Sequence, residues 1–494
     1  MFEYIGVNLT TVLIIVIVSL VVRLLLDRKR YSPPLPPSPS YRLPIIGHLH
    51  LLDIDVRKHL RKFRRQLGDV YSLWYGEKLV IHIAGYENIR EAFLKNADKF
   101  AARPHLYISE KCNKKTGIIW TENELWREQR TFAFSTMKRF GMGKSVLEIK
   151  IKDEAKSLIE EMKKEIGTPF DPRTLLSTCS TNVVVSIVFK GRFQHTDKRL
   201  IQMLDTFNSY IVTAAGIGNF IPWLAKLPGD LFQVKKLFRN WELVIKYAKE
   251  IIAEHEKDFD EDNIEDLTSA YISEMRRLKA SGVATTMNYD QLTGTICDLF
   301  MAGTSTTASA LRWSIVCLVQ FPDIQEKLYN EVSNAIGTEL PSMKDKARLV
   351  YLEAFAMEVM RYCEMILVAM HATSHDLVYK GFSFPKEAMI IPDFDSVLYD
   401  ENIWGDPEVF RPERFIDDHG NLIKRDEMII FFIGKRSCMG EALAKMEMLI
   451  FLGAIVQNFK FESPPGETLT VEKVDGQFGF THGPNIYNVV MTSR

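Results

Sequence analysis

The stretch from Phe431 to Gly440, Phe-Phe-Ile-Gly-Lys-Arg-Ser-Cys-Met-Gly, places one cysteine between glycines directly before an apolar segment. The next residues, Glu441 to Val456, are good helix formers and apolar on nearly every face, which predicts a buried helix. Free N–H groups and the positive dipole end at the start of such a helix lower a thiol pKa and favour a metal-binding thiolate. The glycines let a flat, bulky group approach the backbone, and Arg436 supplies a cation for an anionic substituent. Cys438 taken alone also fits a buried structural cysteine.

The complete pattern narrows this choice. Phe-x-x-Gly-x-Arg-x-Cys-x-Gly has five fixed positions, which are filled here by Phe431, Gly434, Arg436, Cys438 and Gly440. The pattern resembles the haem-ligating signature of the cytochrome P450 family. This resemblance implies that Cys438 is the axial thiolate on the iron of haem b, where its electron donation favours O–O cleavage. It also implies that the other four residues bind the cofactor.

The longest predicted helix, Asp290 to Gln320, carries Ala-Gly-Thr-Ser-Thr-Thr-Ala in its middle. Glycine and threonine are poor helix formers, and threonine hydroxyls compete for backbone carbonyls. The cluster therefore fits either close helix packing or a widened groove beside a reactive ligand. The distal helix of the resembled family has a similar motif, which implies catalytic roles for Gly303, Ser305 and Thr306. Ser305 stands where the family usually has an acid.

Two further predictions concern the carboxylate side chains of haem. Trp126 and Arg130 share one helical face, a spacing that also fits a surface cation beside a half-buried tryptophan. In the resembled family, Trp-x-x-x-Arg donates hydrogen bonds to a haem propionate, which implies this role here. His371 aligns with a propionate-binding residue of the family.

An ion pair on a helix, Glu358 with Arg361, is too common to indicate function by itself. In the resembled family, Glu-x-x-Arg joins the arginine of a later motif, here Arg414, in a buried charge network around the haem-binding core. Removing one member of a buried network leaves an unpaired charge. We therefore expect these three residues to form a structural network.

The composition and the apolar spacing indicate the fold class. Hydrophobic residues make up 46% of the 494-residue chain and charged residues 25%, without internal repeats, which favours one large globular domain. The net charge of −1 gives no indication of nucleic-acid binding. The six cysteines include no Cys-x-x-Cys pair, which is typical of a reducing compartment. We expect a mainly α fold with small β-sheets, and the resemblance implies a cytochrome P450-type haem domain at residues 45–494. Helices are predicted at 87–97, 122–137, 145–166, 175–189, 200–213, 231–259 and 263–279, with a hairpin at 70–84 and strands at 376–385 and after 469.

The N-terminus predicts a membrane anchor. Ile5 to Leu26 is apolar apart from a few polar residues and Arg23, which is long enough for a spanning helix. A small-residue cleavage site is missing, which argues against the alternative of a cleaved signal. Basic residues at 28–30 follow the span and place the rest of the chain in the cytosol. We expect an anchor at residues 1–30 and a proline-rich hinge at 31–44 that acts as an extended spacer. The resemblance implies a single-pass protein of the endoplasmic reticulum membrane, in contact with membrane lipids.

Finer features resemble the microsomal family-2 branch in animals, among them Phe220-Ile-Pro-Trp-Leu and Leu311-Arg-Trp. The resemblance implies a monooxygenase that receives electrons from NADPH through NADPH-cytochrome P450 reductase, with cytochrome b5 as a second candidate partner. Its substrate would be a small hydrophobic lipid, steroid or xenobiotic. A haem-thiolate isomerase or dehydratase acting on peroxides, motivated by Ser305, and a membrane-anchored haem sensor are the alternatives. Predicted pocket segments are 106–120, 207–223, 299–306, 366–370 and 478–480, and departures from the family lie at Leu367, Met370 and Ile430.

Overall fold

The computed structural model describes residues 11–12, 14–15, 18, 31–39, 41–53, 55–142, 145–476 and 478–494. The predicted membrane span, Ile5 to Leu26, lies mostly outside the described residues. Among the helices of this described part, none is both long and apolar enough to cross a bilayer.

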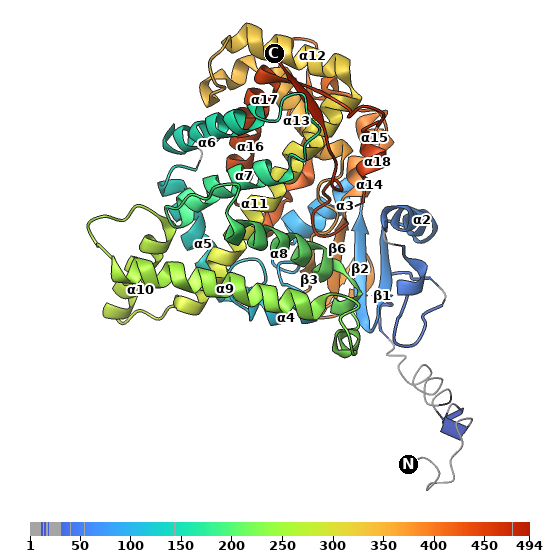
Figure 1. Cartoon of the computed structure of the whole chain (residues 1–494). Coiled ribbons are helices and arrows are strands. Elements are labelled where there is room, and N and C mark those ends of the chain that lie inside the picture. Colours follow the sequence, from blue (N-terminus) through green and yellow to red (C-terminus); the bar gives the residue numbers. More distant parts are fainter. Residues whose placement is uncertain are drawn as a thin grey trace.

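The domain is mainly helical, as the sequence predicted, and Figure 1 shows α11 passing through its middle. The long helices are α2 (Arg57–Leu67), α5 (Asn123–Arg139), α6 (Ser145–Lys163), α7 (Arg173–Val188), α8 (Lys198–Ala215), α9 (Val234–Lys257), α10 (Leu267–Ala280), α11 (Tyr289–Gln320), α12 (Pro322–Ile336) and α13 (Val350–Tyr362). The short ones are α3 (Tyr86–Arg90), α4 (Tyr107–Asn113), α14 (Asp395–Leu398), α15 (Glu401–Trp404), α16 (Glu441–Glu447), α17 (Gly453–Asn458) and α18 (Val471–Val474).

Local chemistry sets the ends of α11. The Asn288 side chain caps its first turn by accepting a hydrogen bond from the Gln291 N–H. Phe321 and Pro322 end it, because proline cannot continue the backbone ladder and instead opens α12. The 32-residue helix between them is buried along most of its length. It therefore forms the centre of the hydrophobic core, with α7 and α9 packed against it.

Two predicted regular helices contain π-helical turns. The helix predicted at 87–97 is α3 followed by the π segment η2 (Glu91–Lys95). The helix predicted at 441–456 is divided by the π segment η9 (Met448–Leu452). A π turn inserts one residue into the helical period, and apolar spacing alone does not reveal it. Both segments lie near the Cys438 loop.

The β-structure is small. β1 (Val70–Tyr75) and β2 (Lys78–Ala84) form the predicted hairpin, and β2 pairs in parallel with β6 (Met389–Asp393). β3 (His371–Ala372) completes a sheet of order β1-β2-β6-β3. Figure 1 shows this sheet beside α2, at one side of the helical bulk. Two further strand pairs are β4 (Leu377–Tyr379) with β5 (Phe382–Phe384), and β7 (Phe459–Glu462) with β8 (Val490–Ser493).

The proline-rich segment, which the sequence predicted as an extended spacer, packs on the domain through the carbonyls of Pro34, Pro36 and Pro37. The Ser383 N–H donates to the Pro34 carbonyl at 2.8 Å, and the Ser72 N–H donates to the Pro37 carbonyl at the same distance. The Ser72 hydroxyl also donates to the Pro36 carbonyl at 2.8 Å. Prolines lack an N–H but keep the acceptor, so an edge strand can bind them through their carbonyls.

Candidate active site

The Cys438 loop is a tight turn held against its own start. The Cys438 N–H donates to the Phe431 carbonyl at 2.8 Å, and the Ser437 N–H donates to the Gly434 carbonyl at 3.1 Å. α16 begins three residues after the cysteine, with Gly440 as its N-cap. All six cysteines are described, and five are buried while Cys438 is exposed. This thiol is thus the accessible one of the chain.

The predicted direction of the thiol pKa is wrong for this structure. Although the Cys438 residue is exposed, protein atoms around its sulfur desolvate the thiolate, and this desolvation together with the Glu441 carboxylate raises the pKa of Cys438 above its ordinary value. Hydrogen bonds from Gly440 and Glu441 N–H groups and the Arg130 charge lower it, but by less. The helix N-terminus acts as expected, yet desolvation of the anion outweighs it. A metal cation bound at the sulfur would favour the thiolate over the thiol.

The two glycines of the motif have different roles. Gly434 has a φ of +76°, and a Cβ at this position would overlap the Phe93 carbonyl in η2. Its missing side chain therefore permits close contact with the backbone of η2. A Cβ on Gly440 would meet only the Cys438 sulfur, at 3.9 Å. Gly440 thus keeps the space beside the sulfur open.

A cluster of cations lies next to the cysteine loop. Arg130 donates to the Ser437 carbonyl at 2.6 Å, and the Arg436 guanidinium carbon lies 4.0 Å from the centre of the Trp126 ring. Arg103, which the sequence analysis did not identify, is a third member, since its charge lowers the pKa of Arg436. Burial, Arg103 and Arg130 together lower the pKa of Arg436 to about 7. In the described part of the chain, none of these three arginines forms an ion pair.

The Trp126 and His371 side chains add two neutral hydrogen-bond donors beside the three arginines. Trp126 is buried, and its Nε1 has no hydrogen-bond partner among the described residues. His371 Nδ1 lies 3.0 Å from the Phe100 carbonyl, and its ring packs against Phe93 and Phe432. Burial and the nearby arginines hold the pKa of His371 well below its usual value. A neutral imidazole and an unpaired indole N–H are both suited to donate to an anionic acceptor.

The middle of α11 presents one accessible stripe. Ala302 is exposed, and Gly303, Thr306 and Ser309 are partly exposed, whereas the residues on the other faces are buried. This spacing puts all four on one helical face. A Cβ on Gly303 would overlap a Val184 methyl group, so this glycine also permits close packing of α7.

Thr306 and Ser305 differ in their surroundings. The Thr306 hydroxyl donates to the Ala302 carbonyl at 2.7 Å and is accessible. Ser305 is 7% exposed. Of the two predicted catalytic hydroxyls, Thr306 is therefore the one on the open face.

The structure brings Glu358, Arg361 and Arg414 together. Arg361 donates to both Glu358 oxygens, at 2.8 and 2.9 Å, and Arg414 donates to Glu358 at 3.0 Å. The side chains of Glu358 and Arg361 are fully buried, and that of Arg414 is 3% exposed. The remaining guanidinium hydrogens bind backbone carbonyls of Leu398, Trp404, Asp406, Pro407 and Val409. The charges are thus fully hydrogen-bonded, as a buried network requires.

Aromatic side chains join three of the predicted pocket segments. The Trp120 and Phe480 rings are 5.8 Å apart, and the Tyr210 and Phe480 rings are 6.3 Å apart. The Trp120 Nε1 is buried without a partner among the described residues. Segments distant in sequence therefore meet in one apolar wall.

Sequence reasoning missed two buried acids, Asp298 on α11 and Glu447 at the end of α16. Asp298 accepts hydrogen bonds from the Ile118 and Ile119 N–H groups at 2.6 and 2.8 Å, and burial raises its pKa to about 7. Glu447 is 1% exposed, hydrogen-bonds with the Thr307 side chain, and has its pKa raised to about 8 by burial. Acids inside strongly apolar helical segments are the sequence signal that could have identified them.

Comparisons with known proteins agree with the fold and the motifs. The sequence model of the cytochrome P450 family matches residues 36–489. Cytochrome P450 2C20 of Macaca fascicularis is 34% identical, over 87% of this chain and 88% of that protein. Cytochrome P450 2E1 of Rattus norvegicus is 32% identical over 92% and 93%, and cytochrome P450 2U1 of Mus musculus is 32% identical over 94% and 92%. The chain belongs to the cytochrome P450 family, and it is a monooxygenase of the oxidoreductase class.

Membership implies a haem whose iron is bound by a cysteine thiolate, and the residues present fit this cofactor. Among the described residues, an accessible cysteine, three guanidinium groups without a carboxylate partner and a buried indole N–H without an acceptor lie in one region. Carboxylate groups of haem would neutralise the cations and accept from the indole.

Proposed function

We propose that this monooxygenase inserts one oxygen atom from O2 into a small hydrophobic substrate, with electrons from NADPH delivered by NADPH-cytochrome P450 reductase. The observation that carries the proposal is the accessible Cys438 beside a cluster of arginines that have no carboxylate partner among the described residues. Haem with a thiolate ligand supplies the activation of O2. The protein residues position the cofactor, exclude water and deliver protons.

Cys438 would bind the iron through its sulfur, which the Gly440 and Glu441 N–H groups stabilise as an anion. Trp126, Arg130, Arg436 and His371 would hold the propionates, and Arg103 adds a further charge to this group. The network of Glu358, Arg361 and Arg414 would fix the segment that precedes the cysteine loop, because its donors bind carbonyls between 398 and 409.

Thr306 would move protons on the open face of α11. Its hydroxyl hydrogen is donated to the Ala302 carbonyl, which leaves the oxygen lone pairs free to accept a hydrogen bond from the open side. Gly303, which has no side chain, would leave room on the same face of α11. Ser305 cannot replace an acid, since a serine hydroxyl relays a proton without supplying one. We therefore infer an active enzyme whose coupling of NADPH use to product is incomplete.

The chemistry of the pocket wall supports an apolar substrate. Trp120, Tyr210 and Phe480 supply large aromatic surfaces, which exclude water and favour a lipid, a steroid or a xenobiotic. The same substrate class would reach the enzyme from a bilayer.

A single-pass anchor at 1–30, a hinge at 31–44 and a haem domain at 45–494 on the cytosolic side of the endoplasmic reticulum membrane complete the proposal. Exposed apolar side chains support contact with lipids, among them Tyr41, Leu43, Trp223 and Leu231. The docking surface for the reductase, and for cytochrome b5, would use the basic end of α5. There Lys138 and Arg139 lie over aromatic rings, whereas Arg127 pairs with Glu124 and Lys435 with Asp98.

The test is the spectrum of the reduced, CO-bound protein. Wild type and the control Cys179→Ala, in which a buried cysteine is removed, should give the absorption diagnostic of thiolate ligation. Cys438→Ala should not, and an unchanged spectrum would contradict the assignment. Consumption of NADPH and O2 with reductase separates a monooxygenase from an isomerase, which would convert a lipid hydroperoxide without either.

A further inference from the structure

Helix α2 (Arg57–Leu67) divides its surface into three faces. Its sequence, Arg-Lys-His-Leu-Arg-Lys-Phe-Arg-Arg-Gln-Leu, contains six lysines and arginines and no acid. Leu60 and Phe63 are buried, and the Phe63 ring lies 6.4 Å from Tyr71 of β1. This apolar face therefore fixes the helix to the sheet.

The second face pairs its charges with the domain. Arg57 forms ion pairs with Glu364 at 2.7 Å and with Asp475 at 2.6 Å. Arg61 donates to both oxygens of Asp395. Arg57 and Arg61 of α2 are thus paired with carboxylates of the domain.

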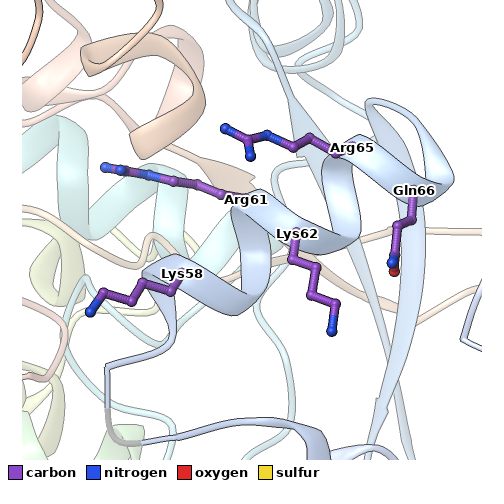
Figure 2. A pocket seen from close by; sticks show the side chains of 5 residues that line it. All are labelled: Lys58, Arg61, Lys62, Arg65 and Gln66. Atoms are coloured by element: carbon purple, nitrogen blue, oxygen red, sulfur yellow. The ribbon is translucent and has the colours of Figure 1, made fainter.

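The remaining solvent-exposed surface of α2 carries three cations that have no acidic partner among the described residues. Lys58, Lys62 and Arg65 are exposed and lie at i, i+4 and i+7, and in the described part of the chain their side chains have no hydrogen bond or ion pair. Together with Arg61 and Gln66 they line a shallow hollow of about 350 Å³. Figure 2 shows Lys58 and Lys62 extending on one side of the helix and Arg61 and Arg65 toward the other. Like charges at this spacing repel one another, so an anion in the hollow would stabilise them.

The position of α2 indicates which anion this is. β1 is an edge strand, and its Ser72 binds the Pro36 and Pro37 carbonyls while the adjacent Tyr71 contacts α2. The basic face therefore lies close to the place where the N-terminal segment joins the domain. Exposed apolar residues, Tyr41, Leu43 and Ile45, follow in the same segment. Apolar side chains beside unpaired cations are typical of surfaces that bind anionic bilayers.

We propose that Lys58, Lys62 and Arg65 bind phosphate headgroups of anionic lipids and thereby set the orientation of the haem domain on the membrane. This inference rests on the proposed membrane anchorage. The anchor would supply the affinity, and α2 would select which side of the domain faces the lipid. A tethered domain needs only a few such contacts, because the anchor already holds the headgroups at high local concentration.

The test measures lysine acylation on the full-length, haem-loaded protein in nanodiscs. Lys58 and Lys62 should react about fivefold more slowly in nanodiscs with phosphatidylserine than in phosphatidylcholine alone, since one cation near an anionic surface gains about that factor. Lys279, exposed on α10, is the internal control and should react equally in both. Added salt should abolish the protection, because headgroup contacts at a surface are screened.

Charge reversal provides the matched control. Lys58→Glu/Lys62→Glu/Arg65→Glu should remove the lipid dependence of reductase-driven turnover, with an unchanged CO spectrum in detergent as evidence of folding. Lys198→Glu/Lys236→Glu/Lys279→Glu carries the same change of net charge on exposed sites and should keep it.

Any one of four outcomes would overturn the proposal. Equal protection in neutral nanodiscs, or equal loss in the control variant, would show that anionic lipid at α2 is not recognised. Protection by inorganic phosphate alone would indicate a general anion site, and protection only by added reductase would indicate a protein partner. Failure of the full chain to enter nanodiscs at all would instead contradict the anchorage on which this inference rests.

Discussion

Glu447 allows a stability prediction that can be worked from the structure. This carboxyl lies at the end of α16, directly before the π segment, and is 1% exposed. A hydrogen bond with the Thr307 side chain connects it to α11, and one of its oxygens has no partner among the described residues. Burial raises its pKa from 4.5 to about 8, so the folded protein keeps a proton there at neutral pH.

The sign of the effect follows from proton binding. Between pH 4.5 and about 8 the folded state holds this proton while the unfolded state has lost it, so the free energy of unfolding falls as the pH rises. The slope is about 1.4 kcal/mol per pH unit, which gives a loss of about 3 kcal/mol at pH 7. Glutamine keeps the size and the hydrogen bond but does not titrate. The free energy of unfolding of Glu447→Gln should therefore fall less than that of wild type as the pH rises.

Urea unfolding of the haem-loaded protein, followed by far-ultraviolet circular dichroism from pH 5.5 to 8.5, measures this difference. Asp298 and Asp393 have pKa values raised to about 7, but they titrate in both proteins and cancel in the comparison. Glu441→Gln, on the same helix and 43% exposed at its side chain, is the matched control and should track wild type. Parallel stability curves for wild type and Glu447→Gln would refute the reasoning.

Three further predictions concern the site. Thr306→Ala should raise the hydrogen peroxide formed per NADPH consumed with a known substrate, and an unchanged ratio would make Thr306 a packing residue. Gly434→Ala should lower the yield of haem-loaded protein because its Cβ overlaps a backbone carbonyl, whereas Gly440→Ala, with 3.9 Å to the nearest atom, should retain most of it. Charge reversal of Lys138 and Arg139 should slow reductase-driven turnover most at low salt and spare peroxide-driven turnover; equal loss in both assays would indicate misfolding.

The sequence predicted most of the helices because apolar spacing reports which face is buried. It placed α11 within one residue of its observed start and identified the hairpin, since both depend on local patterns. The π turns could not be predicted, because apolar spacing over a few residues does not distinguish one inserted residue from a regular helical turn. The thiol pKa could not be predicted either. Its sign depends on desolvation, and desolvation is set by neighbours from elsewhere in the chain.

Arg103 shows why local sequence patterns could not predict the whole site. It donates to the Ile119 and Met370 carbonyls, and Arg436 donates to the Ala101 and Thr121 carbonyls. The segment 101–121 receives all of these bonds except the one to Met370. It also donates to Asp298 on α11 and contributes Trp120 to the aromatic wall. The cations that would hold the cofactor and the wall that would hold the substrate are thus one hydrogen-bonded unit. A substrate that moves this segment must therefore also move the guanidinium groups. A sequence motif of neighbouring residues cannot reveal this coupling, because the coupled residues are far apart in the chain.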